Sequence, residues 1–331
     1  MRALRFDGRL RLDTSLPEPR CTETDAVLRL RQATLTHLDL LAGAGDLAFS
    51  GILGSRAVAT IERVHPHPGG APDGLGARVL AGLPAPCGVC ELCHRGLHAH
   101  CPQRRVPGLH AADGCLADLF AMNLDSLTEI PRSVTDDAAL FAPDVAAVLH
   151  AARALGTPTP RYVTILGDGV EGLIAAQVLA RRLPGLRLLG EQPDRFAITE
   201  RWGVRHRHLA EAGRRQDQDV VIETTGRPEM LEAACALCRP CGTVVLMPPG
   251  APLPMGAFRA ARPPAPISAA SDAELTILCS RGGHLREGLA YIATHGLDVV
   301  SLLGQRLRLS DGVRAYAIAV GDPGKRVRIE P

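Results

Sequence analysis

The feature that most constrains the fold of this 331-residue chain is a glycine-rich turn between a strand pattern and a helix pattern. The apolar segment 162–166 is followed by Gly-Asp-Gly-Val-Glu-Gly at 167–172, and an apolar helix pattern continues to residue 182. Strand and helix patterns then alternate as far as residue 293, which is typical of a parallel sheet covered by helices on both faces. The sequence therefore predicts a doubly wound α/β domain.

The rest of the chain falls into segments with different residue patterns. After the glycine turn we expect strands at 186–189, 219–222, 243–247 and 275–279, and helices at 195–202, 228–237 and 285–293. Before residue 132, short apolar runs at 26–31, 57–64, 77–80 and 116–121 are broken by Gly and Pro, which predicts a β-rich domain. The segment 248–266 is rich in Pro and Ala, and we expect a loop or insertion there.

Three glycines between a strand and a helix suit a bound dinucleotide. We expect Gly167 to make the tight turn, Gly169 to let a pyrophosphate approach the backbone beside Val170, and Gly172 to pack the helix on the strand. Glu191 stands nineteen residues after Gly172, beyond the next strand, where it can accept hydrogen bonds from both hydroxyls of an adenosine ribose.

A carboxylate at position 191 would repel a 2′-phosphate, so we expect NAD(H) in preference to NADP(H). The two acids inside the turn, Asp168 and Glu171, are interpreted as solvated or helix-start charges. The alternative is a sheet of the same kind with an empty crevice.

A second motif consists of four cysteines with metal-ligand spacing: Cys87, Cys90, Cys93 and Cys101. Four thiolates suit one tetrahedral Zn²⁺ in a closed site, which would hold a loop together without doing chemistry. The alternatives are free cysteines, or substitution of one thiolate by His94, His98 or His100. A further run, Cys235, Cys238 and Cys241, has no fourth ligand nearby and is interpreted as buried thiols.

Composition excludes several functions. Lys and Arg number 37 against 35 Asp and Glu, and aromatic residues make up 3% of the chain, so we expect no nucleic-acid partner. Lys325 is the only lysine, which excludes a phosphate loop of the Walker type and disfavours Schiff-base catalysis. No apolar run spans a membrane or forms a secretory signal, so we expect a cytoplasmic protein.

A β-rich half with a four-cysteine lobe, followed by a GxGxxG domain, resembles the medium-chain dehydrogenase/reductase superfamily, the zinc-containing alcohol dehydrogenase group. The resemblance implies an α/β fold with a GroES-like β-barrel domain (1–142, with the zinc lobe at 84–104), a Rossmann domain (143–281) and a return to the first domain (282–331). It also implies hydride transfer between nicotinamide and a carbonyl or alcohol, homodimers formed through the Rossmann sheet, and two zinc sites, one structural and one catalytic.

The sequence departs from that family at the catalytic zinc. Thr36 occupies the position of the first cysteine ligand, and Gly54-Ser55-Arg56 replaces Gly-His-Glu. The third ligand falls at Pro143, or at Ala142 one position earlier, and the proton-relay hydroxyl becomes Leu38. Because hydroxyls beside a guanidinium do not supply three metal ligands, we expect only the structural zinc ion.

Two functional classes remain open. In the first, the chain is a zinc-independent NAD(H) oxidoreductase acting on a carbonyl or an activated C=C or C=N group of an unknown small molecule. Thr36, Ser55 and Arg56 then line the former metal pocket, with Arg56 anchoring a substrate oxygen, and His37 contacts the pyrophosphate. In the second, it is a catalytically silent relative that binds a cofactor, a ligand or a partner protein. For the single residues, the alternatives are that Arg56 only pairs with an acid such as Asp39 or Asp144, and that His37 is an exposed loop residue.

Overall fold

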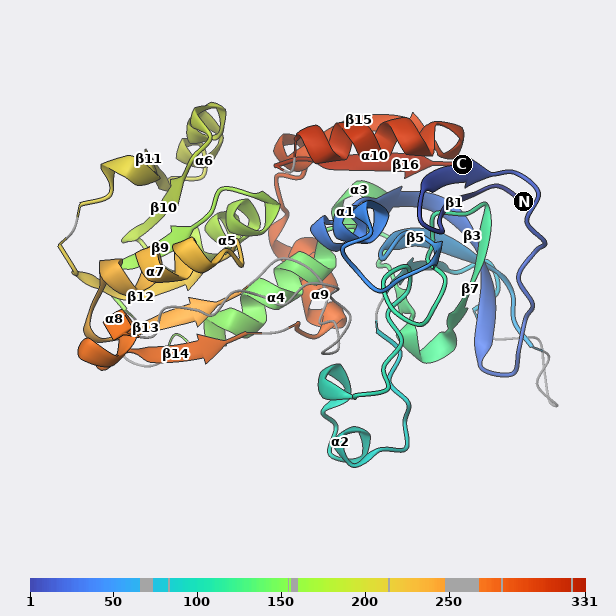
Figure 1. The fold of residues 1–331 in the computed structure, drawn as a ribbon, viewed down its shortest axis with the longest axis horizontal. Helices are drawn as coiled ribbons and strands as arrows, with labels where there is room; N and C mark the ends of the chain where they lie inside the picture. Colours follow the sequence, from blue (N-terminus) through green and yellow to red (C-terminus); the bar gives the residue numbers. More distant parts are fainter. Residues whose placement is uncertain are drawn as a thin grey trace. The chain divides into compact units, whose positions relative to one another are not determined.

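The computed structural model describes residues 1–65, 74–82, 84–153, 155, 160–213, 215–247, 268–280, 282–322 and 324–331. These residues fall into two compact units, one drawn from 1–141 and 303–331 and the other from 142–247 and 268–302 (Figure 1). Among the helices of these ranges, none combines the length and hydropathy that crossing a bilayer requires.

The first unit is built mainly from antiparallel strands. In β3, Leu28 and Leu30 are buried while Arg29 and Arg31 are exposed, because side chains alternate between the two faces of a strand. The larger sheet has the order β15-β16-β3-β5-β6-β8 with β7 also paired to β3, and the smaller has the order β2-β1-β4. The strands are β1 (Ala3–Phe6), β2 (Leu10–Asp13), β3 (Asp25–Thr34), β4 (Gly51–Ile52), β5 (Ala57–Arg63), β6 (Arg78–Ala81), β7 (Leu119–Asn123), β8 (Thr128–Glu129), β15 (Leu303–Arg308) and β16 (Arg326–Glu330).

Short helices accompany these strands. The helices of this unit are α1 (His37–Ala44), α2 (Glu91–His94), α3 (Asp136–Ala139) and α10 (Gly312–Gly321). Strand β16 pairs with β3, with Arg328 opposite Thr34, so the end of the chain completes the first sheet.

The second unit contains a parallel sheet of order β11-β10-β9-β12-β13-β14. Numbered along the chain this is 3-2-1-4-5-6, the order of a doubly wound Rossmann sheet, so the predicted α/β class is confirmed. Its strands are β9 (Val163–Leu166), β10 (Leu186–Gly190), β11 (Arg205–His208), β12 (Gln218–Glu223), β13 (Cys238–Leu246) and β14 (Thr276–Cys279), and its helices are α4 (Ala142–Arg153), α5 (Val170–Ala180), α6 (Phe196–Glu200), α7 (Pro228–Leu237), α8 (Ser268–Asp272) and α9 (Leu285–His295).

The structure differs from the expectation in two places. Strand β11 was not predicted, because its sequence, Arg-His-Arg-His, lacks an apolar run. The return to the first unit begins at residue 303 and not at 282, because α9 packs on α4 within the second unit. A Cβ atom at Gly288 would lie 2.2 Å from the carbonyl oxygen of Ala142, which shows how closely the two helices approach. The expected loop at 248–266 lies outside the described residues.

Candidate functional site

The four predicted metal ligands lie together in the first unit. The sulfur atoms of Cys87, Cys90, Cys93 and Cys101 all lie within 4.8 Å of one another. Cys90 and Cys93 are 3.5 Å apart, Cys90 and Cys101 3.9 Å, and Cys87 and Cys93 4.0 Å. Four sulfurs at about 2.3 Å from one zinc ion are separated by about 3.8 Å, so this cluster fits a tetrahedral ion.

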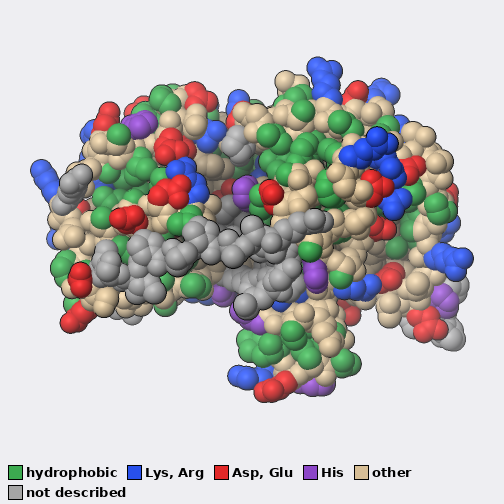
Figure 2. Space-filling model, in the orientation of Figure 1, with side chains coloured by type: hydrophobic (Ala, Val, Ile, Leu, Met, Phe, Trp, Pro, Cys, Tyr) green, Lys and Arg blue, Asp and Glu red, His purple; other side chains and the backbone are tan. Residues whose placement is uncertain are grey.

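The segment around these cysteines lacks a hydrophobic core of its own. Of the described residues from 84 to 104, only Cys93, Cys101 and Arg104 are buried. Val89 is 75% exposed. Hydrophobic side chains are also visible on the surface of this lobe in Figure 2, at the position where Figure 1 labels α2. A metal ion bound by the four cysteines would supply the cohesion that burial does not.

Thr36 and Ser55, predicted from the lost zinc ligands, lie side by side in the first unit. Their hydroxyl oxygens are 3.2 Å apart, and both hydroxyls donate to Asp39 Oδ2, at 2.7 Å from Thr36 and 2.9 Å from Ser55. Their backbone N–H groups also donate to the same carboxylate, at 2.7 and 2.8 Å. The carboxylate of Asp39 thus organises the positions where the family carries metal ligands.

Asp39 was not predicted as the centre of this cluster. Burial raises the pKa of its carboxyl, although the hydrogen bonds from Thr36 and Ser55 oppose the shift. The signal in the sequence was Thr36 three residues before Asp39 at a helix start, because the two form a capping box on α1.

The other two predicted residues of this region lie close by in the chain. Arg56 is 8% exposed, and its Nη1 donates to the carbonyl oxygen of Leu140 at 2.9 Å. His37 begins α1 with its side chain exposed. Leu38, at the position of the family's relay hydroxyl, is buried.

The glycine turn lies between β9 and α5, as predicted. Gly167 has φ +105°, and a Cβ atom there would lie 2.6 Å from Thr224 Oγ1. A Cβ atom at Gly172 would lie 1.8 Å from the carbonyl oxygen of Gly167, so both glycines are required by the packing itself.

Gly169 differs from these two glycines. Its φ of −67° suits any residue, and the nearest heavy atom to an added Cβ is 3.7 Å away. It is the N-cap of the 11-residue helix α5, and no side chain caps the backbone N–H groups that begin at Val170. A helix start that no side chain caps and that the protein packs only loosely fits the phosphates of a dinucleotide.

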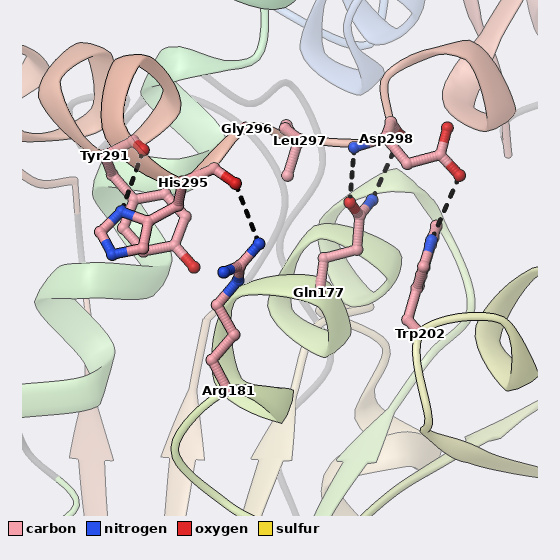
Figure 3. A pocket seen from close by; sticks show the side chains of 8 residues that line it. All are labelled: Gln177, Arg181, Trp202, Tyr291, His295, Gly296, Leu297 and Asp298. Carbon is pink, nitrogen blue, oxygen red and sulfur yellow. Dashed lines mark hydrogen bonds between the residues drawn. The ribbon is translucent and has the colours of Figure 1, made fainter.

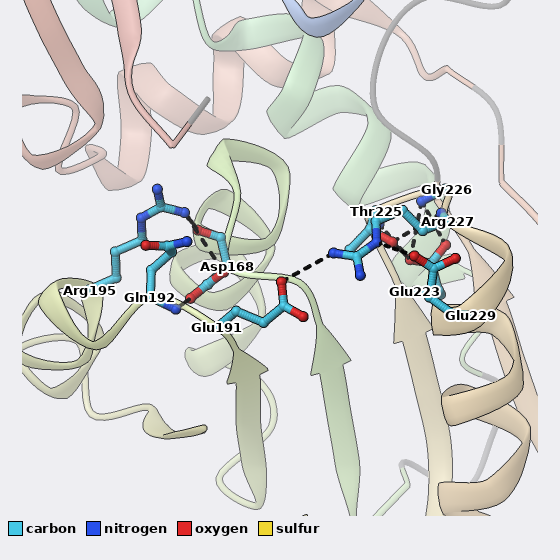
Figure 4. A network of polar contacts seen from close by, with 9 residues as sticks. All are labelled: Asp168, Glu191, Gln192, Arg195, Glu223, Thr225, Gly226, Arg227 and Glu229. Atoms are coloured by element: carbon cyan, nitrogen blue, oxygen red, sulfur yellow. Dashed lines mark hydrogen bonds and ion pairs between the residues drawn. The ribbon is translucent and has the colours of Figure 1, made fainter. Parts of the chain in front are cut away.

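Glu191 follows the last residue of β10, the strand next to β9. Its carboxylate is about half exposed and lies 3.1 Å from Arg227 Nη1 (Figure 4). It therefore stands at the carboxyl end of the sheet, the end at which open α/β sheets bind ligands.

Asp168 is not a solvated charge, in contrast to the prediction. It is 7% exposed, accepts the N–H of Gln192 at 2.8 Å, and lies 3.7 Å from Arg195 (Figure 4). It also lies 3.5 Å from His206. Burial alone would raise the pKa of Asp168, but His206, the Gln192 N–H and Arg195 together hold it below its usual value. The ionised carboxylate thus fixes the turn that carries Glu191.

A separate half-open cavity of about 280 Å³ lies in the second unit, lined by Gln177, Arg181, Trp202, Tyr291, His295, Gly296, Leu297 and Asp298 (Figure 3). Gln177 and Asp298 exchange two hydrogen bonds there, and Arg181 donates to the carbonyl oxygen of His295. Arg181 is the residue after α5, so this cavity lies at the opposite end of that helix from Gly169.

Comparison with known proteins assigns residues 22–132 to the alcohol dehydrogenase GroES-like domain family. Acryloyl-coenzyme A reductase from Sulfurisphaera tokodaii is 29% identical over 234 residues, which cover 67% of this chain and 69% of that protein.

Solved structures show the same fold. A zinc-binding dehydrogenase of Sinorhizobium meliloti, bound to NADP, superposes with a TM-score of 0.83 at 21% identity, over 100% of this chain and 99% of the other. An alcohol dehydrogenase of Escherichia coli, complexed with NADH, superposes with a TM-score of 0.85 at 18% identity and the same coverage. The GroES-like family match at residues 22–132, the acryloyl-coenzyme A reductase relative, the Rossmann sheet order and the four-cysteine cluster together support membership of the medium-chain dehydrogenase/reductase superfamily.

Proposed function

We propose that this protein is an NAD(H)-dependent oxidoreductase that transfers hydride to or from a carbonyl or an activated C=C or C=N group. The observation that carries the proposal is the start of α5 at Gly169, where no side chain caps the helix and an added Cβ atom would have only an ordinary contact, 3.7 Å from Glu171 Oε2. Glu191, at the end of the neighbouring strand, is placed to accept hydrogen bonds from the adenosine ribose. The nucleotides bound to similar folds support this proposal.

We propose further that the reaction proceeds without a zinc ion at the substrate. The hydroxyls of Thr36 and Ser55 donate to Asp39, and a hydroxyl in this arrangement is a poor ligand compared with the thiolate and imidazole of the family. The remaining charged candidate is Arg56, whose guanidinium would stabilise negative charge on a substrate carbonyl oxygen. Thr36 and Ser55 act as positioning residues, because their hydrogen bonds to Asp39 hold the segments around residues 36 and 55 together.

A substrate with a conjugated carbonyl suits this arrangement. A nicotinamide cofactor, when bound, would supply the hydride for such a reduction, and the Arg56 guanidinium would stabilise the negative charge that develops on the substrate carbonyl oxygen. Such a reaction needs less electrophilic assistance than reduction of a plain ketone. Similarity to acryloyl-coenzyme A reductase, over two thirds of the chain, favours this class of substrate.

Replacement of Gly169 by Ala tests the cofactor site. A methyl group at position 169 meets no atom of the protein within 3.7 Å, so the variant is expected to fold as the wild type does. It would, however, keep a pyrophosphate from the helix start, and we expect NADH affinity to fall about tenfold or more. Calorimetric titration with NADH measures the effect.

Gly321→Ala is the matched control, because an added Cβ there meets nothing within 4 Å and lies in the first unit. Its NADH affinity should equal that of the wild type. Absence of NADH and NADPH binding to the wild-type protein would refute the oxidoreductase proposal. Binding without turnover of any conjugated carbonyl or alcohol would favour the catalytically silent alternative.

A further inference from the structure

The carboxyl end of the second sheet brings three loops together. Strand β9 lies between β10 and β12, and Leu166 is in register with both Leu189 and Glu223. Glu191 leaves the end of β10 and Arg227 follows the end of β12. Their contact of 3.1 Å therefore spans the end of β9, where the glycine turn begins (Figure 4).

Arg227 is held in this position from its own side of the contact. It is the N-cap of α7, and its Nε donates to Glu229 Oε1 at 2.8 Å. The preceding turn is fixed by Glu223, which is 2% exposed and accepts the N–H groups of Thr225 and Gly226 at 2.6 and 3.0 Å. Arg227 is thus presented on an ordered turn and is not simply a mobile surface side chain.

The ion pair between Glu191 and Arg227 can be replaced at little cost by contacts of each side chain with a ligand. Both side chains are nearly half exposed, at 47% and 45%, and exposed ion pairs contribute little to stability. A carboxylate that accepts one hydrogen bond from Arg227 can accept further hydrogen bonds from ribose hydroxyls, and a guanidinium matches the geometry of a phosphate. Any group that hydrogen-bonds to this carboxylate lies within reach of Arg227.

Resting on the function proposed above, we propose that Arg227 is a second coenzyme-selecting residue, which lets the adenosine subsite accept the 2′-phosphate of NADP(H) beside Glu191. With NAD(H), Glu191 accepts the ribose hydroxyls. With NADP(H), Arg227 turns from Glu191 to the phosphate while Glu229 keeps the guanidinium at the site. The preference for NAD(H) expected from Glu191 alone is therefore weak in this chain.

The other charged residues at this end of the sheet are not suited to bind the 2′-phosphate as Arg227 is. Asp168 and Arg195 also lie at this end of the sheet, but both are buried and the Arg195 guanidinium faces both the carboxylate and the backbone carbonyl of Asp168. Glu229 opposes a bound phosphate, because its negative charge lies against the same guanidinium. The three residues 191, 227 and 229 thus set the balance between the two coenzymes.

The test compares the affinities of NADH and NADPH by calorimetry, together with adenosine 5′-monophosphate and adenosine 2′,5′-bisphosphate, which differ only in the 2′-phosphate. We expect the wild-type protein to bind NADPH within about tenfold of NADH. In Arg227→Gln, the ratio of the NADPH to the NADH dissociation constant should rise about fivefold or more, mainly because NADPH binds more weakly. In Glu229→Gln the ratio should fall about two- to threefold.

Arg153→Gln is the matched control, because Arg153 forms a similarly exposed ion pair with Glu287 within the same unit, and its ratio should not change. If NADH binds but NADPH does not, or if Arg227→Gln weakens both nucleotides equally, the role of Arg227 is wrong and the proposed function stands. If neither nucleotide nor either adenosine phosphate binds, the proposed function fails together with this inference.

Discussion

Single carboxylates organise the two candidate sites of this protein. Asp39 accepts four hydrogen bonds from Thr36 and Ser55, and Asp168 accepts the N–H of Gln192 while facing Arg195 and His206. Asp39 holds Thr36 and Ser55, and Asp168 fixes the turn that carries Glu191; these are residues that the sequence predicts to be functional. In both cases the chemistry-bearing side chain depends on a buried acid whose removal would leave N–H groups without acceptors.

The pH dependence of stability should report the ionised state of Asp168. Its folded-state pKa lies below its unfolded value of about 3.9, so its contribution is present above that value and is lost as the pH falls through the lowered folded pKa. Asp168→Asn should lower the free energy of unfolding at pH 7 by about 2 kcal/mol and flatten the acid limb. Urea unfolding followed by Trp202 fluorescence, at pH 7 and at about pH 2.5, measures both.

The neighbouring Asp194 provides the control, because its side chain is exposed. Asp194→Asn should behave like the wild type at both pH values. An Asp168→Asn variant with unaltered stability and an unaltered acid limb would mean that the buried carboxylate contributes nothing to the turn.

At the scale of elements, the cysteine lobe is the part of the fold that burial does not hold together. Its ends are joined by the two backbone hydrogen bonds between Ala85 and Arg105, at 2.8 and 2.9 Å. Between them, the described residues carry only two buried side chains other than Arg104, both of them cysteines. The lobe should therefore be ordered by its metal, independently of the glycine turn.

Metal analysis and hydrogen exchange test this. We expect about one zinc ion per wild-type chain, and Cys93→Ser should lose it, because three thiolates bind zinc more weakly than four. Amide exchange should then rise across residues 84–104 while the segment 163–180 keeps its protection.

Cys241→Ser is the matched control. Cys241 belongs to the second cysteine run, in which Cys235 and Cys238 are buried as expected but Cys241 is exposed, in contrast to the prediction. It should retain the zinc ion. Two zinc ions per wild-type chain would contradict the proposal of a zinc-free substrate site, and zinc retained by Cys93→Ser would contradict the four-cysteine site.

At the scale of the whole molecule, the two edges of the parallel sheet differ. Strand β11 exposes Arg205 and Arg207, and charged edges resist pairing with another strand. Strand β14, at the other end, exposes the uncharged residues Thr276, Ile277 and Cys279. We propose that a second copy of the chain adds its own β14 here and forms a homodimer.

Light scattering on the purified protein should give twice the chain mass of 35.0 kDa. Ile277→Lys should shift the mass towards one chain, because a charge would enter the shared edge. Val300→Lys is the control, as Val300 is 79% exposed but lies outside the sheet. A wild-type monomer at micromolar concentration would refute the dimer.

The elements that the sequence predicts well are those specified by neighbours in the chain. The turn at 167–172 and the cysteine spacing at 87–101 are local patterns, and the structure has a strand, turn and helix at the first and a four-sulfur cluster at the second. Strand β11 escaped prediction because its only strongly buried residue, His206, packs on Phe196 and Asp168 and not on an apolar run.

By itself, the sequence determined the α/β class, the glycine turn and the cysteine cluster, because each depends on residue types at short spacing. Only the tertiary structure decided what surrounds them: Ser55 reaches Asp39 across 16 residues, Asp168 meets His206 from another strand, and Arg227 reaches Glu191 across 36 residues. These contacts depend on which strands become neighbours and on which charged groups are buried together. Strand order and burial arise from packing of the whole chain, which no local pattern specifies.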